Sequence, residues 1–191
     1  KADRALALGL AAADLLVRGG ERVGLLGLSN AFATRGIVDR LAEILAVEAG
    51  REVERAELPP AIALAPRNRA ILIGDFLIEP QQFATRLATI ASRGASGHLV
   101  MIADPVEETF PFTGHVELIE PDMPTTLRMG RAESWRADYE KRLARHRAEI
   151  ADIARAHNFS LLIHRTDRSA SEALIALRAR LEASGTSGAL A

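Results

Sequence analysis

The sequence predicts a single α/β domain, residues 1–191, with a doubly wound, mostly parallel sheet and helices on both faces. Short apolar runs alternate with segments of helical period, which is the order of strand–helix–strand units. Several of the runs are apolar throughout, as in strands covered on both sides. The chain has 191 residues, 48% hydrophobic and 26% charged, which is typical of one folded domain.

Composition excludes several classes of function. The 24 basic and 25 acidic side chains give a net charge of −1, which argues against a general binder of nucleic acid or anionic membrane. The absence of cysteine excludes disulfides, thiolate zinc sites, iron–sulfur clusters and cysteine nucleophiles. The longest apolar stretch, residues 5–17, contains Asp14 and is shorter than the roughly 20 residues that cross a bilayer. We therefore expect no membrane span, and a cytoplasmic location.

The first third of the chain contains three predicted elements. Residues 3–18 have the apolar density of a buried helix, which Gly19 and Gly20 end. The short apolar run ERVGLLGL, residues 21–28, predicts a strand. Residues 34–49 repeat apolar positions at helical spacing, and Gly50 is the expected end of that helix.

Three prolines between residues 51 and 69 exclude a long regular element there. The run AILIGDFL, residues 70–77, predicts an inner parallel strand. A helix is expected from Pro80, a residue favoured in the first helical turn, to Gly94. The run GHLVMIA, residues 97–103, predicts the next strand.

The last part of the chain first interrupts this alternation and then resumes it. Residues 116–119 and 126–129 predict a small hairpin insertion. A long helix over 133–157, with an apolar face that includes Trp135, is followed by a strand over 159–164. A final helix begins at the S-x-x-E capping box of Ser169 and Glu172, and Gly185 is expected to end it.

Acidic residues follow the predicted strands, at the edge where doubly wound sheets bind ligands. They are Asp75, Asp104 and Asp167. Each could be a metal ligand or an acid that faces a substrate, or it could cap a helix or shape a turn. For Asp104, which precedes Pro105, the turn interpretation is favoured. The sequence contains no histidine pair with metal-ligand spacing, no glycine-rich phosphate loop and no G-x-S-x-G motif, so no catalytic residue or cofactor is assigned.

Four stretches together resemble the bacterial domain of unknown function 58 family. They are KADRALALGLAAADLLVRGGERVGLLGL, AILIGDFL, ADPVEETFPFTGHVELIE and RADYEKRLARHRAEIADIARAHNFSLLIHRTDRSASEALIALRARL. The resemblance implies a fold like that of von Willebrand factor A domains, which is Rossmann-like, and association with MoxR-type AAA+ ATPases. It therefore implies a non-enzymatic protein-interaction domain whose binding rim carries Asp75, Asp104 and Asp167. The alternative is a metal-dependent hydrolase that uses these same acids.

Von Willebrand A domains bind a divalent cation through a D-x-S-x-S loop, a threonine and an aspartate. By resemblance, Asp75 in IGDF matches that aspartate. The D-x-S-x-S loop would lie upstream of Lys1, and the stretch ERAELPPAIALAPRNR, where the threonine is expected, has neither threonine nor serine. The resemblance thus implies a degenerate site at Asp75, with Mg²⁺ bound only in a longer parent protein.

The same resemblance implies a central strand upstream of Lys1, between the strands predicted at residues 21–28 and 70–77. We therefore expect a longer parent protein. Without that strand, unpaired backbone groups would be exposed on both neighbours. We expect the gap to be closed by re-pairing of these strands or by another chain.

Overall fold

The computed structural model describes residues 1–49, 57–119 and 126–187, and its centre is a three-stranded sheet. The strands are β1 (Arg69–Gly74), β2 (Ser96–Ala103) and β5 (Phe159–Arg165), in the order β1–β2–β5. Both pairings are parallel, with Leu72 opposite Leu99 and Leu99 opposite Leu161. The predicted α/β class with a mostly parallel sheet is confirmed.

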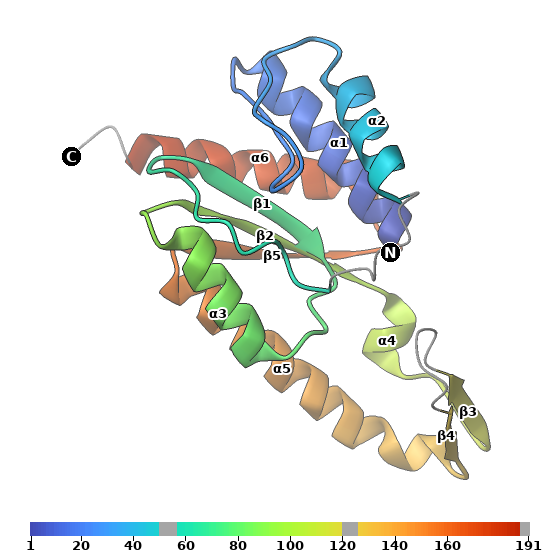
Figure 1. Cartoon of the computed structure of the whole chain (residues 1–191). Coiled ribbons are helices and arrows are strands. Elements are labelled where there is room, and N and C mark those ends of the chain that lie inside the picture. Colours follow the sequence, from blue (N-terminus) through green and yellow to red (C-terminus); the bar gives the residue numbers. More distant parts are fainter. Residues whose placement is uncertain (50–56, 120–125, 188–191) are drawn as a thin grey trace.

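Helices cover both faces of this sheet (Figure 1). On one face, α1 (Ala2–Arg18) and α6 (Ala170–Ser187) contribute Leu8, Ala12, Ala173 and Leu177 to a core shared with β2. On the other face, α3 (Pro80–Ala91) and α5 (Arg136–Ala156) contribute Phe83, Leu87, Ile90 and Ile150. The helix α2 (Ile37–Ala49) packs on α1 through Ile37 and Leu41. This is the doubly wound arrangement that the sequence predicts.

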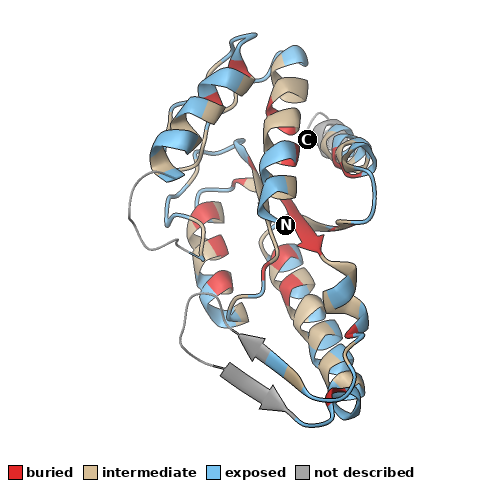
Figure 2. Ribbon diagram, turned by 90° about the vertical axis from the view of Figure 1, so that its right-hand side faces the viewer, coloured by how far each residue is buried: buried red, intermediate tan, exposed pale blue. Residues whose placement is uncertain are grey.

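The core is centred on β2. Every residue of β2 after Ser96 is buried, whereas β1 and β5 at the edges are only partly buried. Figure 2 shows the same distribution, with buried residues concentrated in the sheet and on the helix faces turned toward it. Strands with both faces covered are apolar on both sides, and the apolar sequence of β2 therefore agrees with its central position between β1 and β5.

The strand expected at residues 21–28 is wrong. Residues 21–33 instead form a loop closed by one antiparallel bridge, between Val23 and Phe32. Gly27, at the tip, has φ +80°, which an extended strand does not permit. The expected re-pairing of 21–28 with the strand beginning at Ala70 is therefore also wrong, since β1 pairs with β2 alone among the described residues. Closure of the gap by another chain stays a prediction.

Several predicted boundaries differ from the structure. The helix expected over 34–49 begins at Ile37, and the helix expected from Pro80 to Gly94 ends at Ala91. The strand predicted over 70–77 ends at Gly74, because Phe76 adopts a left-handed conformation with φ 52° and turns the chain. The long helix begins at Arg136 after a 3₁₀ turn, η1 (Ala132–Trp135), and Trp135 is 51% exposed rather than buried. The final helix continues past Gly185 to Ser187. Gly50, where the second helix is expected to end, and residues 120–125, which join the two strands of the hairpin, lie outside the described residues.

The hairpin insertion is confirmed, and a short helix precedes it. Strands β3 (Val116–Ile119) and β4 (Thr126–Met129) pair antiparallel, separate from the main sheet. The helix α4 (Pro105–Thr109) was not predicted. Phe110, Phe112 and Tyr139 form an aromatic cluster between this region and α5. The ring centroid of Phe110 lies 5.1 Å from that of Phe112 and 4.8 Å from that of Tyr139.

No helix in the described ranges is both long enough and apolar enough to cross a membrane. This agrees with the interrupted apolar stretch at residues 5–17.

Candidate functional site

The three predicted acids follow the carboxyl ends of the three parallel strands. Asp75 comes directly after β1, Asp104 directly after β2, and Asp167 two residues after β5. Since parallel strands end at the same edge of a sheet, these turns share one rim. We use "rim" below for residues 75–77, 104–110 and 165–167, together with Lys1 and Arg147.

An ion-pair bridge joins the turn after β1 to helix α4. The Lys1 ammonium lies 2.9 Å from Asp75 Oδ2 and 2.6 Å from Glu107 Oε1. Burial by itself would lower the pKa of Lys1, but the hydrogen bonds to Glu107 and Asp75 outweigh it and raise that pKa. Lys1 therefore stays charged throughout the physiological pH range and holds the two carboxylates together.

Asp104 links the second turn to the third. Its Oδ1 accepts a 2.9 Å hydrogen bond from the Val106 backbone amide and so caps α4. Its Oδ2 accepts a 3.1 Å hydrogen bond from the Thr166 hydroxyl. Asp104 is thus a helix cap, the structural alternative weighed for it from sequence, and it also holds the loop that carries Asp167.

Asp167 is part of a second ionic group. Arg165 donates to both of its carboxylate oxygens, at 3.1 and 2.9 Å, and also approaches Glu108 Oε2 at 3.4 Å. Arg147 of α5 donates to Glu108 Oε1 at 2.6 Å. Asp75 and Asp167 remain 43% and 45% exposed, so a binding partner can reach both.

The rim does not have the donor set of a divalent-cation site. Asp75 Oδ2 is held by Lys1, and its Oδ1 accepts a 3.4 Å hydrogen bond from the Leu77 amide. Within the described residues no group of three His, Asp or Glu side chains converges on one point. Mg²⁺ takes about six oxygen ligands, and one carboxylate already paired with an ammonium does not supply them. Binding of Mg²⁺ by a longer parent protein stays a prediction.

Two large apolar side chains are exposed on the rim. Leu77 is 52% exposed and lies two residues after Asp75, and Val106 is 48% exposed beside Glu107. Because Lys1 bridges Asp75 and Glu107, the turn that carries Leu77 and the helix α4 that carries Val106 are held close together. Exposed apolar groups framed by charged ones are typical of protein-binding surfaces.

Sequence reasoning missed the basic half of this rim. Lys1, Arg147 and Arg165 belong to no motif. Lys1 lies 74 residues from its partner Asp75, and Arg147 and Arg165 lie 39 and 57 residues from Glu108, with which both pair. The only available signal was the HRTDR segment after β5, in which Arg165 and Asp167 pair with each other.

A second polar pair lies within the sheet, near the opposite ends of the strands. His98 of β2 is buried, and its Nδ1 lies 2.8 Å from the hydroxyl oxygen of Ser160 on β5. Burial, Arg69 and Arg180 together lower the pKa of His98. A second buried histidine, His164, lies near the carboxyl end of β5, and its Nε2 accepts a hydrogen bond of 2.9 Å from Arg4. Burial and then Arg4 lower its pKa as well.

These two histidines predict a loss of stability in mild acid. The unfolded chain binds a proton at each histidine near pH 6.5, whereas the folded chain, in which both pKa values are lowered, binds these protons only at a lower pH, so acid favours unfolding. We expect the free energy of unfolding to fall as the pH drops below about 6.5, by at most about 1.4 kcal/mol per pH unit for each histidine. Urea unfolding between pH 8 and pH 5 measures this. In His98→Asn the slope should be smaller; an unchanged slope would contradict the assignment to His98.

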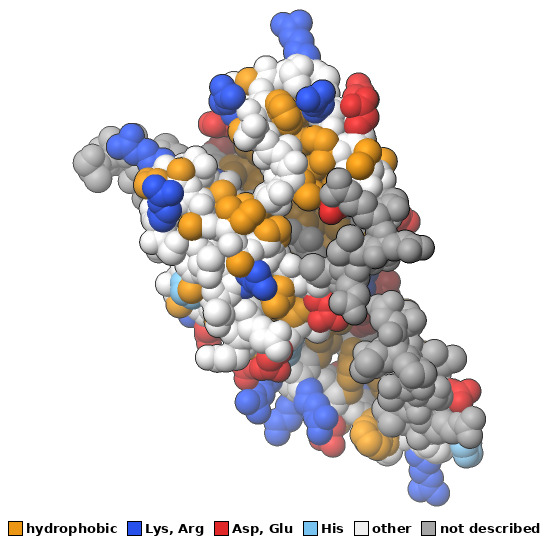
Figure 3. Space-filling model, viewed as in Figure 1, with side chains coloured by type: hydrophobic (Ala, Val, Ile, Leu, Met, Phe, Trp, Pro, Cys, Tyr) orange, Lys and Arg blue, Asp and Glu red, His pale blue; other side chains and the backbone are white. Residues whose placement is uncertain are grey.

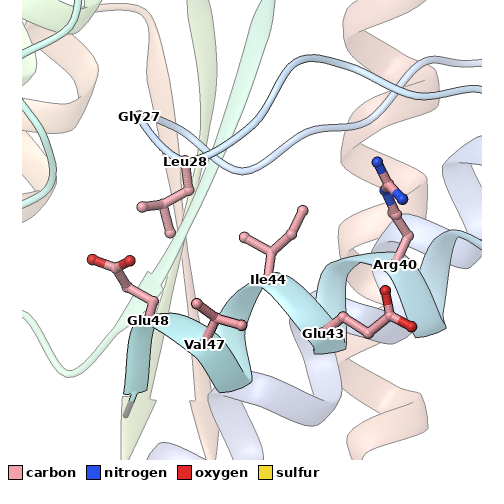
Figure 4. Close-up of a pocket in the computed structure, with 7 residues that line it drawn as sticks. All are labelled: Gly27, Leu28, Arg40, Glu43, Ile44, Val47 and Glu48. Atoms are coloured by element: carbon pink, nitrogen blue, oxygen red, sulfur yellow. The ribbon is translucent and has the colours of Figure 1, made fainter. Parts of the chain in front are cut away.

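A separate groove lies between α2 and the loop 21–33. It has a volume of about 430 Å³, and Leu28, Ile44 and Val47 line its apolar part (Figure 4). Arg40, Glu43 and Glu48 border it. Figure 3 shows hydrophobic side chains on this part of the surface, where Leu28 is 41% and Val47 is 63% exposed. The groove contains none of the residues predicted as site residues.

The fold defines the chain as a parallel α/β protein of the Rossmann-like class, with charged side chains at the carboxyl edge of its sheet. The family model described as "Protein of unknown function DUF58" matches residues 1–149, and the chain belongs to this family. No curated protein and no solved structure gives a significant match.

Proposed function

We propose that this domain is a non-enzymatic protein-interaction module that binds its partner at the rim. One observation carries the proposal: the exposed Leu77 and Val106 lie directly beside the bridge that Lys1 forms with Asp75 and Glu107. An apolar centre flanked by exposed charges provides both affinity and orientation in protein complexes.

The state of the rim acids supports binding rather than catalysis. A general acid or base needs a carboxylate that is free to exchange a proton with a substrate. Asp75 is paired with Lys1, Asp104 caps a helix, and Asp167 is held by both nitrogens of an Arg165 fork. The hydrogen bonds and ion pairs fix the shape of the surface, which a docking interface requires.

We propose a MoxR-type AAA+ ATPase as the partner, on the strength of the family resemblance. The exposed Asp75 and Asp167 would face basic side chains of the ATPase, and Leu77 and Val106 would occupy an apolar depression between them. The resemblance to von Willebrand A domains, which bind partners at the same edge of the sheet, points to the same surface.

The test is a direct binding measurement with a purified MoxR-type ATPase from the same organism. We expect Val106→Asp to weaken binding about tenfold or more, because it places a charge at the apolar centre of the interface. Val106 takes part in capping α4 only through its backbone, with its amide at the start of the helix and its carbonyl at the end, so the fold should be retained. Asp75→Ala should also weaken binding.

The matched control is Ile175→Asp, which also replaces an exposed β-branched apolar side chain with a carboxylate, at a residue of α6 that is 68% exposed and outside the rim. It should bind as the unmodified domain does. If Val106→Asp and Ile175→Asp bind equally well, the rim is not the interface. If the unmodified domain does not bind the ATPase, this partner is wrong.

A further inference from the structure

Two phenylalanines at the rim adopt a backbone conformation that bulky residues rarely take. Phe76, in the turn after β1, has φ 52°, and Phe110, at the end of α4, has φ 40°. Both side chains are buried, with 7% and 5% of their surface exposed. A left-handed backbone is unfavourable for a phenylalanine, so the surrounding structure must stabilise it.

The same helix holds both of these turns. The carbonyl of Phe76 accepts a 2.7 Å hydrogen bond from His146 Nε2, and the carbonyl of Phe110 accepts a 3.0 Å hydrogen bond from Arg136 Nε. His146 and Arg136 both belong to α5. Next to His146, Arg147 forms its 2.6 Å ion pair with Glu108 of α4.

The buried rings supply the second half of each anchor. Phe76 packs against Phe83 of α3, with ring centroids 5.4 Å apart, and Phe110 packs against Tyr139 of α5 at 4.8 Å. Each strained turn is therefore fixed at two points, the ring in the core and the carbonyl on α5. When the hydrogen bond to the carbonyl is removed, only the ring contact remains, and we expect the backbone of the turn to rotate toward an unstrained φ.

We infer that His146 and Arg136 are positioning residues of the rim: α5 holds the turns at Phe76 and Phe110 in their left-handed conformation through these two side chains. His146 thereby orients Asp75 and Leu77, the residues on either side of Phe76. This inference rests on the proposed function for its biological meaning, but its structural content can be tested without a partner.

The partner-free test is hydrogen exchange of the Leu77 amide, which donates to Asp75 Oδ1 within the turn. In His146→Leu we expect this amide to exchange about tenfold faster, because the loss of a part-buried hydrogen bond lets the turn open. His146→Gln, whose side-chain amide can still donate to the Phe76 carbonyl, should restore most of the protection.

Two controls separate positioning from general destabilisation. Arg145→Leu changes the neighbouring residue, whose side chain is 82% exposed, and should leave the Leu77 amide unchanged. Arg136→Met should instead accelerate exchange of the Phe110 amide, which donates to Val106 O, and should leave Leu77 unaffected. Unchanged exchange of Leu77 in His146→Leu would overturn the inference, as would equal acceleration in His146→Gln.

Binding to the ATPase provides a second measurement. His146→Leu should weaken binding, and His146→Gln should restore it. If exchange at Leu77 changes as expected but binding does not, the positioning role stands and docking at the rim is wrong. If exchange does not change, the positioning role is wrong, whatever the binding result.

Discussion

Gly97→Ala is expected to prevent the sheet from forming at its present spacing. A Cβ atom on Gly97 would overlap the carbonyl oxygen of Ala70 on β1 and would lie 2.5 Å from a ring carbon of Phe159 on β5. Gly97 is paired with Ala70 on one side and with Phe159 on the other, so neither strand can move away without breaking its pairing with β2. Overpacking typically costs about 1–3 kcal/mol, and a clash with backbone belongs at or above the upper end of that range.

The measurement is urea unfolding followed by circular dichroism. The matched control is Gly74→Ala at the end of β1, where no atom lies within 4 Å of the added Cβ and φ is not positive. It should change the free energy of unfolding by less than about 0.5 kcal/mol. Equal stability of the two variants would show that β1 and β2 are not packed as closely as described.

The fold could be predicted where the local pattern and the tertiary structure require the same thing. The run GHLVMIA is apolar throughout, and β2 is buried on both faces, so pattern and environment agree. The apolar run ERVGLLGL failed because its glycines permit a turn as readily as a strand, and Gly27 takes φ +80°. A short apolar run predicts burial, but it does not decide between a strand and a packed loop.

The rim could be predicted in part for the same reason. That Asp75, Asp104 and Asp167 share an edge follows from the topology of a parallel sheet, which is readable from sequence. Their partners do not follow, because Lys1 and Arg147 reach the rim only through the packing of α1 and α5. The left-handed conformation of Phe76 is not marked by any local pattern either. It depends on contacts with Phe83 of α3 and His146 of α5, which lie outside the turn.

Phe83→Ala should be strongly destabilising and should also disturb the rim. Phe83 has no exposed surface and packs among Leu87, Leu99, Met101 and Ile150. Deleting its ring leaves a cavity under the sheet, and such truncations cost about 3–5 kcal/mol. Urea unfolding checks the stability, and Ile175→Ala, at a site that is 68% exposed, should stay within about 0.5 kcal/mol of the unmodified domain.

The effect on the rim follows from the contact between Phe83 and Phe76. With the Phe83 ring gone, the Phe76 ring loses its 5.4 Å neighbour, and the His146 hydrogen bond is left as the main restraint on the left-handed turn. We therefore expect the Leu77 amide to exchange faster in Phe83→Ala even under conditions in which the domain stays folded. Combining Phe83→Ala with His146→Leu should accelerate exchange more than the two single changes predict together, because each anchor partly compensates for the loss of the other. Strictly additive effects would show that ring and carbonyl act on the turn independently.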